Sequence, residues 1–134
     1  MPSPVIFART DAGRAEAGHA SERNDCAVRA VAGVGIPYAK AHAFWRRVGR
    51  KYRTGVRYEI SLRKLRFWLR ENGIKTQLVR VKGTVEAFVK RNADGTYICT
   101  TKTHAFTVAQ GVVLDTVKWS GKKRIASAML CTKL

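Results

Sequence analysis

The chain has 134 residues, and its 26 lysines and arginines against nine aspartates and glutamates give a formal charge of +17. Hydrophobic residues make up 46% of the sequence, which is enough for a core and excludes global disorder. The length fits a single domain covering 1–134, and no apolar run is long enough to span a membrane.

We expect residues 1–20 to form an N-terminal arm that contains one short strand at Val5–Phe7. Within the arm, glycines punctuate Asp11–Gly18 and predict a turn or a short helix. The N-terminus lacks a basic start followed by a long apolar stretch, so it does not resemble a secretory signal. We therefore expect a cytoplasmic protein.

The segment Asn24–Gly33 predicts a buried helix, because its body consists of small apolar residues. Asp25 is a favourable N-cap, which places Cys26 in the first turn of this helix. Glycines end it. Three further helices are expected: one from Pro37 or Tyr38 to Arg47, one at Leu62–Glu71 with Ser61 as its cap, and a short one capped by Thr84.

The rest of the chain is strand-like, with alternating and β-branched residues at Lys75–Val81, Thr96–Thr101, His104–Ala109 and Val112–Val117. The last two segments predict a tight hairpin around Gln110–Gly111. Helices therefore dominate residues 24–92 and strands dominate residues 93–134. This order predicts an α+β fold in which N-terminal helices pack on a C-terminal antiparallel sheet.

Three of the predicted elements each carry a residue of a type that takes part in nucleophilic catalysis. Cys26 lies at a helix N-terminus, where the helix dipole stabilises a thiolate. His104 starts a strand, and Asp115 follows eleven residues later on the next strand of the hairpin. Adjacent antiparallel strands can place an aspartate beside a histidine and fix its tautomer. A buried packing cysteine, a core histidine and a turn aspartate are the alternative interpretations of the same residues.

The chain resembles the papain-like cysteine peptidases, in particular the compact domains that trim bacteriocin leaders. Three motifs carry the resemblance: Asn24–Ala30, Thr103–Val108 and Gly111–Thr116. With Asp11–Gly18 added, they resemble a group of phage and prophage proteins. The resemblance implies a papain-like fold whose nucleophile is Cys26, with His104 as general base and acid and Asp115 as its orienting partner. It also makes a virion or another larger assembly a candidate partner.

The sequence departs from the family's usual pattern at one position. Papain-like enzymes usually carry a glutamine about six residues before the cysteine, to donate to the oxyanion, and Ala20 occupies that place here. Either Asn24 or Ser21 supplies the missing donor, or catalysis is slow or lost, because one oxyanion donor typically contributes about 10²–10³ in rate.

The remaining cysteines and histidines suggest no second site. Cys99 and Cys131 are expected to be structural, and the wide spacing of the cysteines predicts no zinc site. His19 and His42 have no suitable partner nearby in the sequence, and His42 is expected at the surface. We expect no cofactor and no metal.

The middle of the chain is strongly basic: thirteen lysines and arginines between residues 40 and 80 face only Glu59 and Glu71. This balance predicts contact with a polyanion, either nucleic acid or a nucleoprotein assembly. Candidate contact residues are Arg46, Arg47, Arg50, Lys51, Arg53, Arg57, Arg63, Lys64 and Arg66.

Three functions are therefore open. The first is a cysteine peptidase with a peptide or protein substrate and a polyanion-binding surface. The second is a non-catalytic protein on the same fold that binds nucleic acid or a nucleoprotein. The third is an acyl or amide transferase or a deamidase, since the triad serves both hydrolysis and transfer.

Overall fold

The computed structural model describes residues 5–134, apart from the side chains of residues 59 and 60. Within this range the chain forms an α+β structure of four helices and one six-stranded mixed sheet. The helices are α1 (Cys26–Ala32), α2 (Tyr38–Arg47), α3 (Tyr58–Glu71) and α4 (Val85–Arg91). The strands are β1 (Ile6–Arg9), β2 (Ile74–Val79), β3 (Thr96–Thr100), β4 (Ala105–Ala109), β5 (Val112–Asp115) and β6 (Ser127–Lys133).

The strands lie in the order β1-β5-β4-β3-β6-β2. All neighbours are antiparallel except β1, which runs parallel to β5 with Arg9 opposite Asp115. The expected purely antiparallel sheet is therefore wrong at one edge. The N-terminal arm returns to the sheet from a distant point of the chain, so its direction is not constrained by a hairpin.

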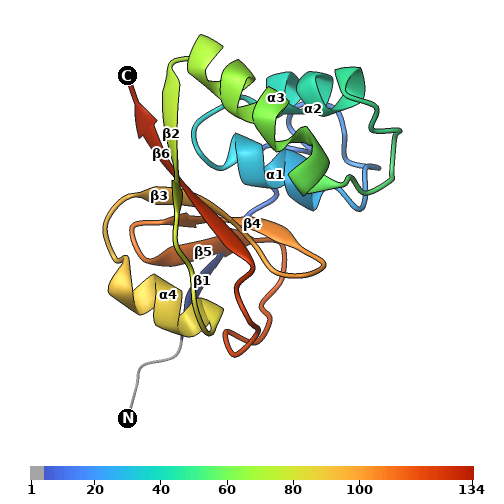
Figure 1. The fold of residues 1–134 in the computed structure, drawn as a ribbon. Coiled ribbons are helices and arrows are strands. Elements are labelled where there is room, and N and C mark those ends of the chain that lie inside the picture. Colours follow the sequence, from blue (N-terminus) through green and yellow to red (C-terminus); the bar gives the residue numbers. More distant parts are fainter. Residues whose placement is uncertain (1–4) are drawn as a thin grey trace.

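Helices cover both faces of the sheet, and each face has its own apolar core. On one face α1, α2 and α3 pack around Trp45, Leu65 and Leu69 against inward residues of β3, β4 and β6. On the other face α4 contributes Val85 and Phe88 to a second cluster. Figure 1 shows the three helices grouped together, with α4 apart from them at the other end of the molecule.

One predicted helix start is wrong, one predicted cap lies at the right position without capping, and one cap is confirmed. The third helix begins at Tyr58 rather than Leu62, so Ser61 lies inside it and caps nothing. Tyr58 is buried against Trp45, and this packing extends the helix upstream. Asp25 does occupy the N-cap position of α1, but its side chain makes no capping hydrogen bond. Thr84 caps α4 as predicted, accepting from the Ala87 N–H at 3.1 Å.

The strand β6 was not predicted, although it lies inside the sheet between β3 and β2. Its partners bury Ala128, Met129 and Cys131, so the third cysteine is a core residue of a central strand. Residues 11–18 form successive turns, in agreement with the turn or short helix that their glycines predict. None of the helices described here is long and apolar enough to cross a membrane.

A close approach between α1 and β4 sets the geometry that matters for the site. A Cβ atom on Gly33 would lie 2.1 Å from the Thr107 hydroxyl oxygen, so only glycine fits there. The same hydroxyl donates to the Ala30 carbonyl at 2.7 Å. The small residues of α1 therefore allow the helix to lie directly on β4, with Cys26 near the beginning of that strand.

Candidate active site

Cys26 is the first residue of α1 and is partly exposed, whereas Cys99 and Cys131 are buried. Its backbone N–H belongs to the first turn, where helical N–H groups have no partner within the helix. His104 lies immediately before β4, the strand against which α1 packs. The fold thus brings the thiol and the imidazole together from positions 78 residues apart in the sequence.

Asp115, the last residue of β5, holds the imidazole from the far side. Its Oδ2 lies 2.6 Å from His104 Nε2, and the carboxylate is almost completely buried. Because Nε2 is engaged by the carboxylate, Nδ1 is the ring nitrogen left for the Cys26 thiol. This is the arrangement in which a carboxylate orients an imidazole toward a nucleophile.

The three groups perturb one another in the directions expected for an ion pair. Burial raises the pKa of the Cys26 thiol, but hydrogen bonds from His104 and the Ala105 N–H outweigh it and leave the pKa below its ordinary value. Burial lowers the pKa of His104, but bonds to Asp115 and Cys26 raise it to about 9. For Asp115, burial is outweighed by bonds from His104, Trp119 and Arg29, and its pKa falls. These shifts favour a thiolate beside an imidazolium.

A network of charged side chains contacts the Asp115 oxygen that does not bind His104, and the sequence patterns did not predict it. Arg29 donates to Asp115 Oδ1 at 2.8 Å through Nη1 and to Asp25 Oδ1 at 3.1 Å through Nε. Asp25 also accepts from Arg14 at 3.2 Å and from the Tyr38 hydroxyl at 2.9 Å. The carboxylate that would cap α1 is therefore used to bind Arg29. Through Arg14, Asp25 and Arg29, these contacts connect the N-terminal arm to Asp115.

Trp119 completes the surroundings of the aspartate. Its indole N–H donates to Asp115 Oδ2 at 2.7 Å, and its ring lies edge-on to His104 and Phe106. Asp115 thus receives donors on both oxygens and stays ionised in a buried position. Two features of the sequence could have indicated these contacts: the i,i+4 spacing of Asp25 and Arg29, and the tryptophan four residues beyond Asp115.

No family model, curated protein or solved structure matches this chain. The site therefore has to be interpreted from its own chemistry.

Two hollows flank His104 and form a cleft across the triad. One, of about 510 Å³, contains Cys26 and is bordered by Arg57 and Lys102. The other, of about 300 Å³, lies over Asp115 and Trp119 and is bordered by Lys123. Among the residues described, the Cys26 side of the cleft has no acidic lining residue. Any group that enters this hollow therefore lies near positive charge.

The predicted oxyanion donors are both engaged elsewhere. The side-chain amide of Asn24 donates to the Arg53 carbonyl at 3.1 Å, and the Ser21 hydroxyl lies 2.7 Å from the Tyr52 hydroxyl. The backbone N–H of Cys26 is the donor that the helix itself supplies. An oxyanion role for Asn24 stays a prediction.

Two expectations about surface residues are wrong, because both residues serve a buried carboxylate. Glu22 is 4% exposed and receives both terminal nitrogens of Arg50 at 2.9 Å. The His42 ring lies 2.7 Å from the same carboxylate and stacks on His19 with ring centroids 4.0 Å apart. Burial raises the pKa of Glu22, but the bonds from Arg50 and His42 lower it to about 2. Arg50 is thus a structural residue and is removed from the polyanion-binding set.

The other predicted contact residues are at or near the surface. Arg66 is partly buried, and its guanidinium donates to the Thr76 hydroxyl at 3.0 Å. The exposed ones are Arg46, Arg47, Lys51, Arg53, Arg57, Arg63 and Lys64. Within the described part of the chain, no group of three or more His, Cys, Asp or Glu residues is placed to hold a metal ion.

Proposed function

We propose that this chain is a papain-like cysteine hydrolase, a peptidase of the phage type, that acts through Cys26, His104 and Asp115. The observation that carries the proposal is the position of His104, which lines the same hollow as Cys26 and is hydrogen-bonded to a buried aspartate with donors on both oxygens. Isolated packing residues would not need the Asp115 carboxylate to be ionised in the core, where burial of an unpaired charge is very costly.

The chemistry follows from the protonation states. The Cys26 thiolate attacks the carbonyl carbon, and the carbonyl π electrons move to oxygen to form a tetrahedral oxyanion. When this collapses, the bond to the leaving nitrogen breaks, and the His104 imidazolium donates its proton to the amine. A thioester remains. His104, now neutral, takes a proton from water as the water oxygen bonds to the thioester carbon; the C–S bond then breaks, which releases the carboxylic acid and regenerates the Cys26 thiolate beside the His104 imidazolium. An amine in place of water would give transfer, so the triad is compatible with both outcomes.

The basic border of the cleft supports a preference for acidic substrates. Arg57 and Lys102 flank the hollow that contains Cys26, and Lys123 borders the hollow on the other side of His104. We expect peptides with Asp or Glu near the scissile bond to be cleaved faster than peptides with Lys or Arg there. Arg57→Ala should reduce this difference, and paired fluorogenic peptides at low ionic strength would measure it.

The decisive experiment is alkylation of each cysteine against pH, followed by mass spectrometry, in the wild type and in His104→Ala. We expect Cys26 to react rapidly below pH 7 in the wild type and slowly in the variant. The other two cysteines are internal controls: burial raises the pKa of Cys99 well above its usual range and that of Cys131 to about 12. A Cys26 that reacts no faster than they do, or equally fast in His104→Ala, would rule out the proposed ion pair.

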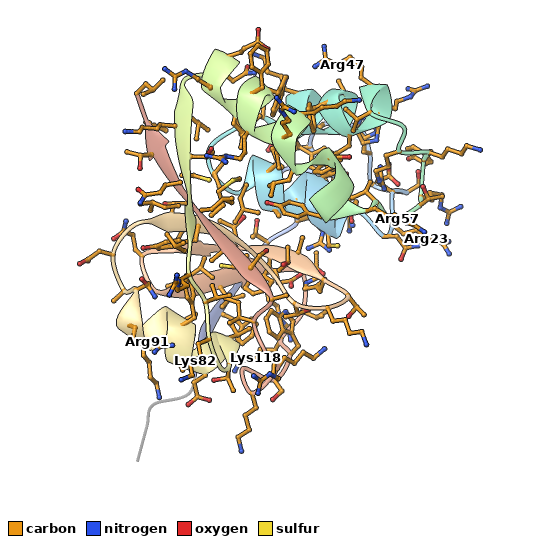
Figure 2. All side chains as sticks on the ribbon, viewed as in Figure 1. Arg23, Arg47, Arg57, Lys82, Arg91 and Lys118 are labelled. Atoms are coloured by element: carbon orange, nitrogen blue, oxygen red, sulfur yellow. The ribbon has the colours of Figure 1, made fainter. Side chains whose placement is uncertain are left out.

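We propose secondly that the surface binds a polyanion, independently of the hydrolase. The formal charge of +17 supports this, as does the distribution of exposed cations over the whole molecule. Figure 2 shows labelled side chains projecting outward at widely separated places: Arg47 beside the helices, Arg23 and Arg57 at one edge, and Lys82, Arg91 and Lys118 at the α4 end. General charge of this kind supports affinity without specifying a binding site.

A further inference from the structure

A further hollow lies on the outer side of α3, outside the two hollows that flank His104. It has a volume of about 500 Å³, a size common for ligand sites. Four cationic side chains line it together with a phenylalanine and a threonine: Arg63, Arg66, Phe67, Arg70, Lys75 and Thr76. Leu62 borders both this hollow and the one that contains Cys26, so the two are neighbours on α3. We call it the α3–β2 groove.

The helical repeat explains how these side chains come together. Arg63, Phe67 and Arg70 are spaced at i, i+4 and i+7, which places them on one face of α3. The opposite face carries Leu65 and Leu69, which are fully buried in the core. Lys75 comes from the start of β2, the edge strand beside the helix. The groove is therefore a fixed feature of two packed elements rather than of a loop.

Phe67 belongs to neither of the two apolar core clusters. Its side chain is 67% exposed, the most exposed aromatic residue among those described. A single exposed apolar residue is common on protein surfaces and by itself implies nothing. Here, however, the ring lies among four cations in a hollow with no acidic lining residue among those the structure describes.

Arg66 is already held in place for an incoming group. Its Nε donates to the Thr76 hydroxyl at 3.0 Å and its Nη2 donates to the Thr76 carbonyl at 3.4 Å. These bonds leave the rest of the planar fork available, at reduced entropic cost for binding an anion.

We propose that the α3–β2 groove binds single-stranded nucleic acid, with a base stacked on Phe67 and the backbone phosphates held by the surrounding Arg and Lys side chains. An aromatic platform beside a cationic track is how single strands are bound without sequence preference. A duplex keeps its bases stacked on one another and offers no free face to Phe67. An acidic peptide would satisfy the cations and leave the aromatic ring without a matching partner. The inference deepens the polyanion proposal, on which it rests, and is independent of the hydrolase.

The test is fluorescence anisotropy on the full chain with a labelled oligothymidine of about 12 nucleotides. Phe67→Ala should weaken binding about 5- to 150-fold, the range for loss of one base–aromatic stack. Phe67→Trp should retain binding. Ile6→Ala is the matched control, because Ile6 is 64% exposed and lies on the opposite edge strand. With an abasic oligomer of equal length, Phe67→Ala should have no effect.

The charges are tested by salt dependence. Arg70→Ala should reduce the slope of log affinity against log salt by about 0.7, the value for one phosphate contact on a single strand. The control is Arg91→Ala, at the α4 end of the molecule (Figure 2), which should leave the slope unchanged.

The outcomes distinguish binding at the α3–β2 groove from general binding of polyanions by the surface. No binding to the oligomer at low salt overturns both the groove and general polyanion binding. Binding that is weakened equally by Arg91→Ala and Arg70→Ala, and not by Phe67→Ala, overturns the groove and leaves general polyanion binding in place. Tighter binding of duplex, or displacement by oligoglutamate at equal charge concentration, assigns the groove to another ligand. His104→Ala should bind as the wild type does, because the hydrolase is not involved.

Discussion

Replacing Arg29 by methionine tests whether the ionic network behind the triad holds the site together. Arg29 is the one side chain that contacts both Asp25 and Asp115 within the described network. Its side chain is 13% exposed, and the two carboxylates are 1% and 2% exposed. Methionine keeps the length and packing of the aliphatic stem but leaves both carboxylates without their shared cation.

The magnitude follows from what remains. Removing one partner of a buried ion pair typically costs about 3–5 kcal/mol, because the other charge is left uncompensated. Asp25 keeps Arg14 and Tyr38, and Asp115 keeps His104 and Trp119. We therefore expect the lower end, about 3 kcal/mol, a large share of the stability of a domain of this size. Arg29→Lys keeps the charge but cannot reach both carboxylates with one ammonium, and should lose less.

Arg29→Met should also change the chemistry. The Arg29 charge helps to lower the pKa of Cys26, and its bond helps to lower that of Asp115. Without it, both pKa values should rise, and the alkylation rate of Cys26 should reach its plateau at higher pH. Arg29→Lys should lie between the two. This pH profile is a readout that lost packing alone would not move.

Urea unfolding measures the stability loss, and the exposed pair Lys90–Glu86 provides the matched control. It has the same i,i+4 spacing as Asp25–Arg29, but the two side chains are 39% and 24% exposed. Lys90→Met should cost less than about 1 kcal/mol. If Arg29→Met costs no more than Lys90→Met and leaves the Cys26 profile unchanged, the network does not support the triad.

Local patterns along the chain predicted most elements, and they predicted that Cys26, His104 and Asp115 lie close together. The helix of small residues after Asp25, the cap at Thr84 and the hairpin at Gln110–Gly111 depend on neighbours within a few positions. Such signals survive folding because tertiary contacts agree with them. The pairing of His104 with Asp115 was accessible for the same reason, since the hairpin brings them together.

Two of the errors come from contacts that are distant in the sequence. Arg50 is predicted at the surface because no residue near it in the sequence indicates a buried partner. That partner is Glu22, which lies 28 residues upstream. His42 was misplaced by the same carboxylate. The strand β6 has buried residues on both faces, so it lacks the strict alternation that identifies a half-exposed strand. A count of charges cannot separate cations that solubilise the surface from those that neutralise buried acids.

Three further substitutions test single contacts in the structure. Glu22→Gln should lower the free energy of unfolding by about 3–5 kcal/mol near neutral pH, because the buried charge of Arg50 is left without its partner. This loss should become smaller as the pH falls from 4.5 toward the Glu22 pKa of about 2. Urea unfolding at a series of pH values would measure it. Gly33→Ala should cost at least about 1–3 kcal/mol by forcing α1 off Thr107, whereas Gly55→Ala, with open space around it, should be nearly neutral in the same assay. His104→Ala should lower the free energy of unfolding only within a limited pH window.

The upper limit of that window comes from the pKa of His104 and the lower limit from the pKa of Asp115. The folded pKa of His104 is about 9 and its ordinary value is 6.5, so the stabilisation by the imidazolium is complete below pH 6.5 and is lost as pH rises to 9. Asp115 has a lowered pKa, so its contribution is present above its ordinary value of 3.8 and is lost on acidification. The difference in free energy of unfolding between wild type and His104→Ala should therefore be largest between about pH 4 and 6.5. Repeating the pair of measurements in Cys26→Ala removes one of the groups that raise the His104 pKa, so the upper limit should move to lower pH. An upper limit that stays fixed without the thiol would mean that Cys26 and His104 do not interact, and a difference that persists unchanged above pH 9 would mean that the imidazolium is not what Asp115 binds.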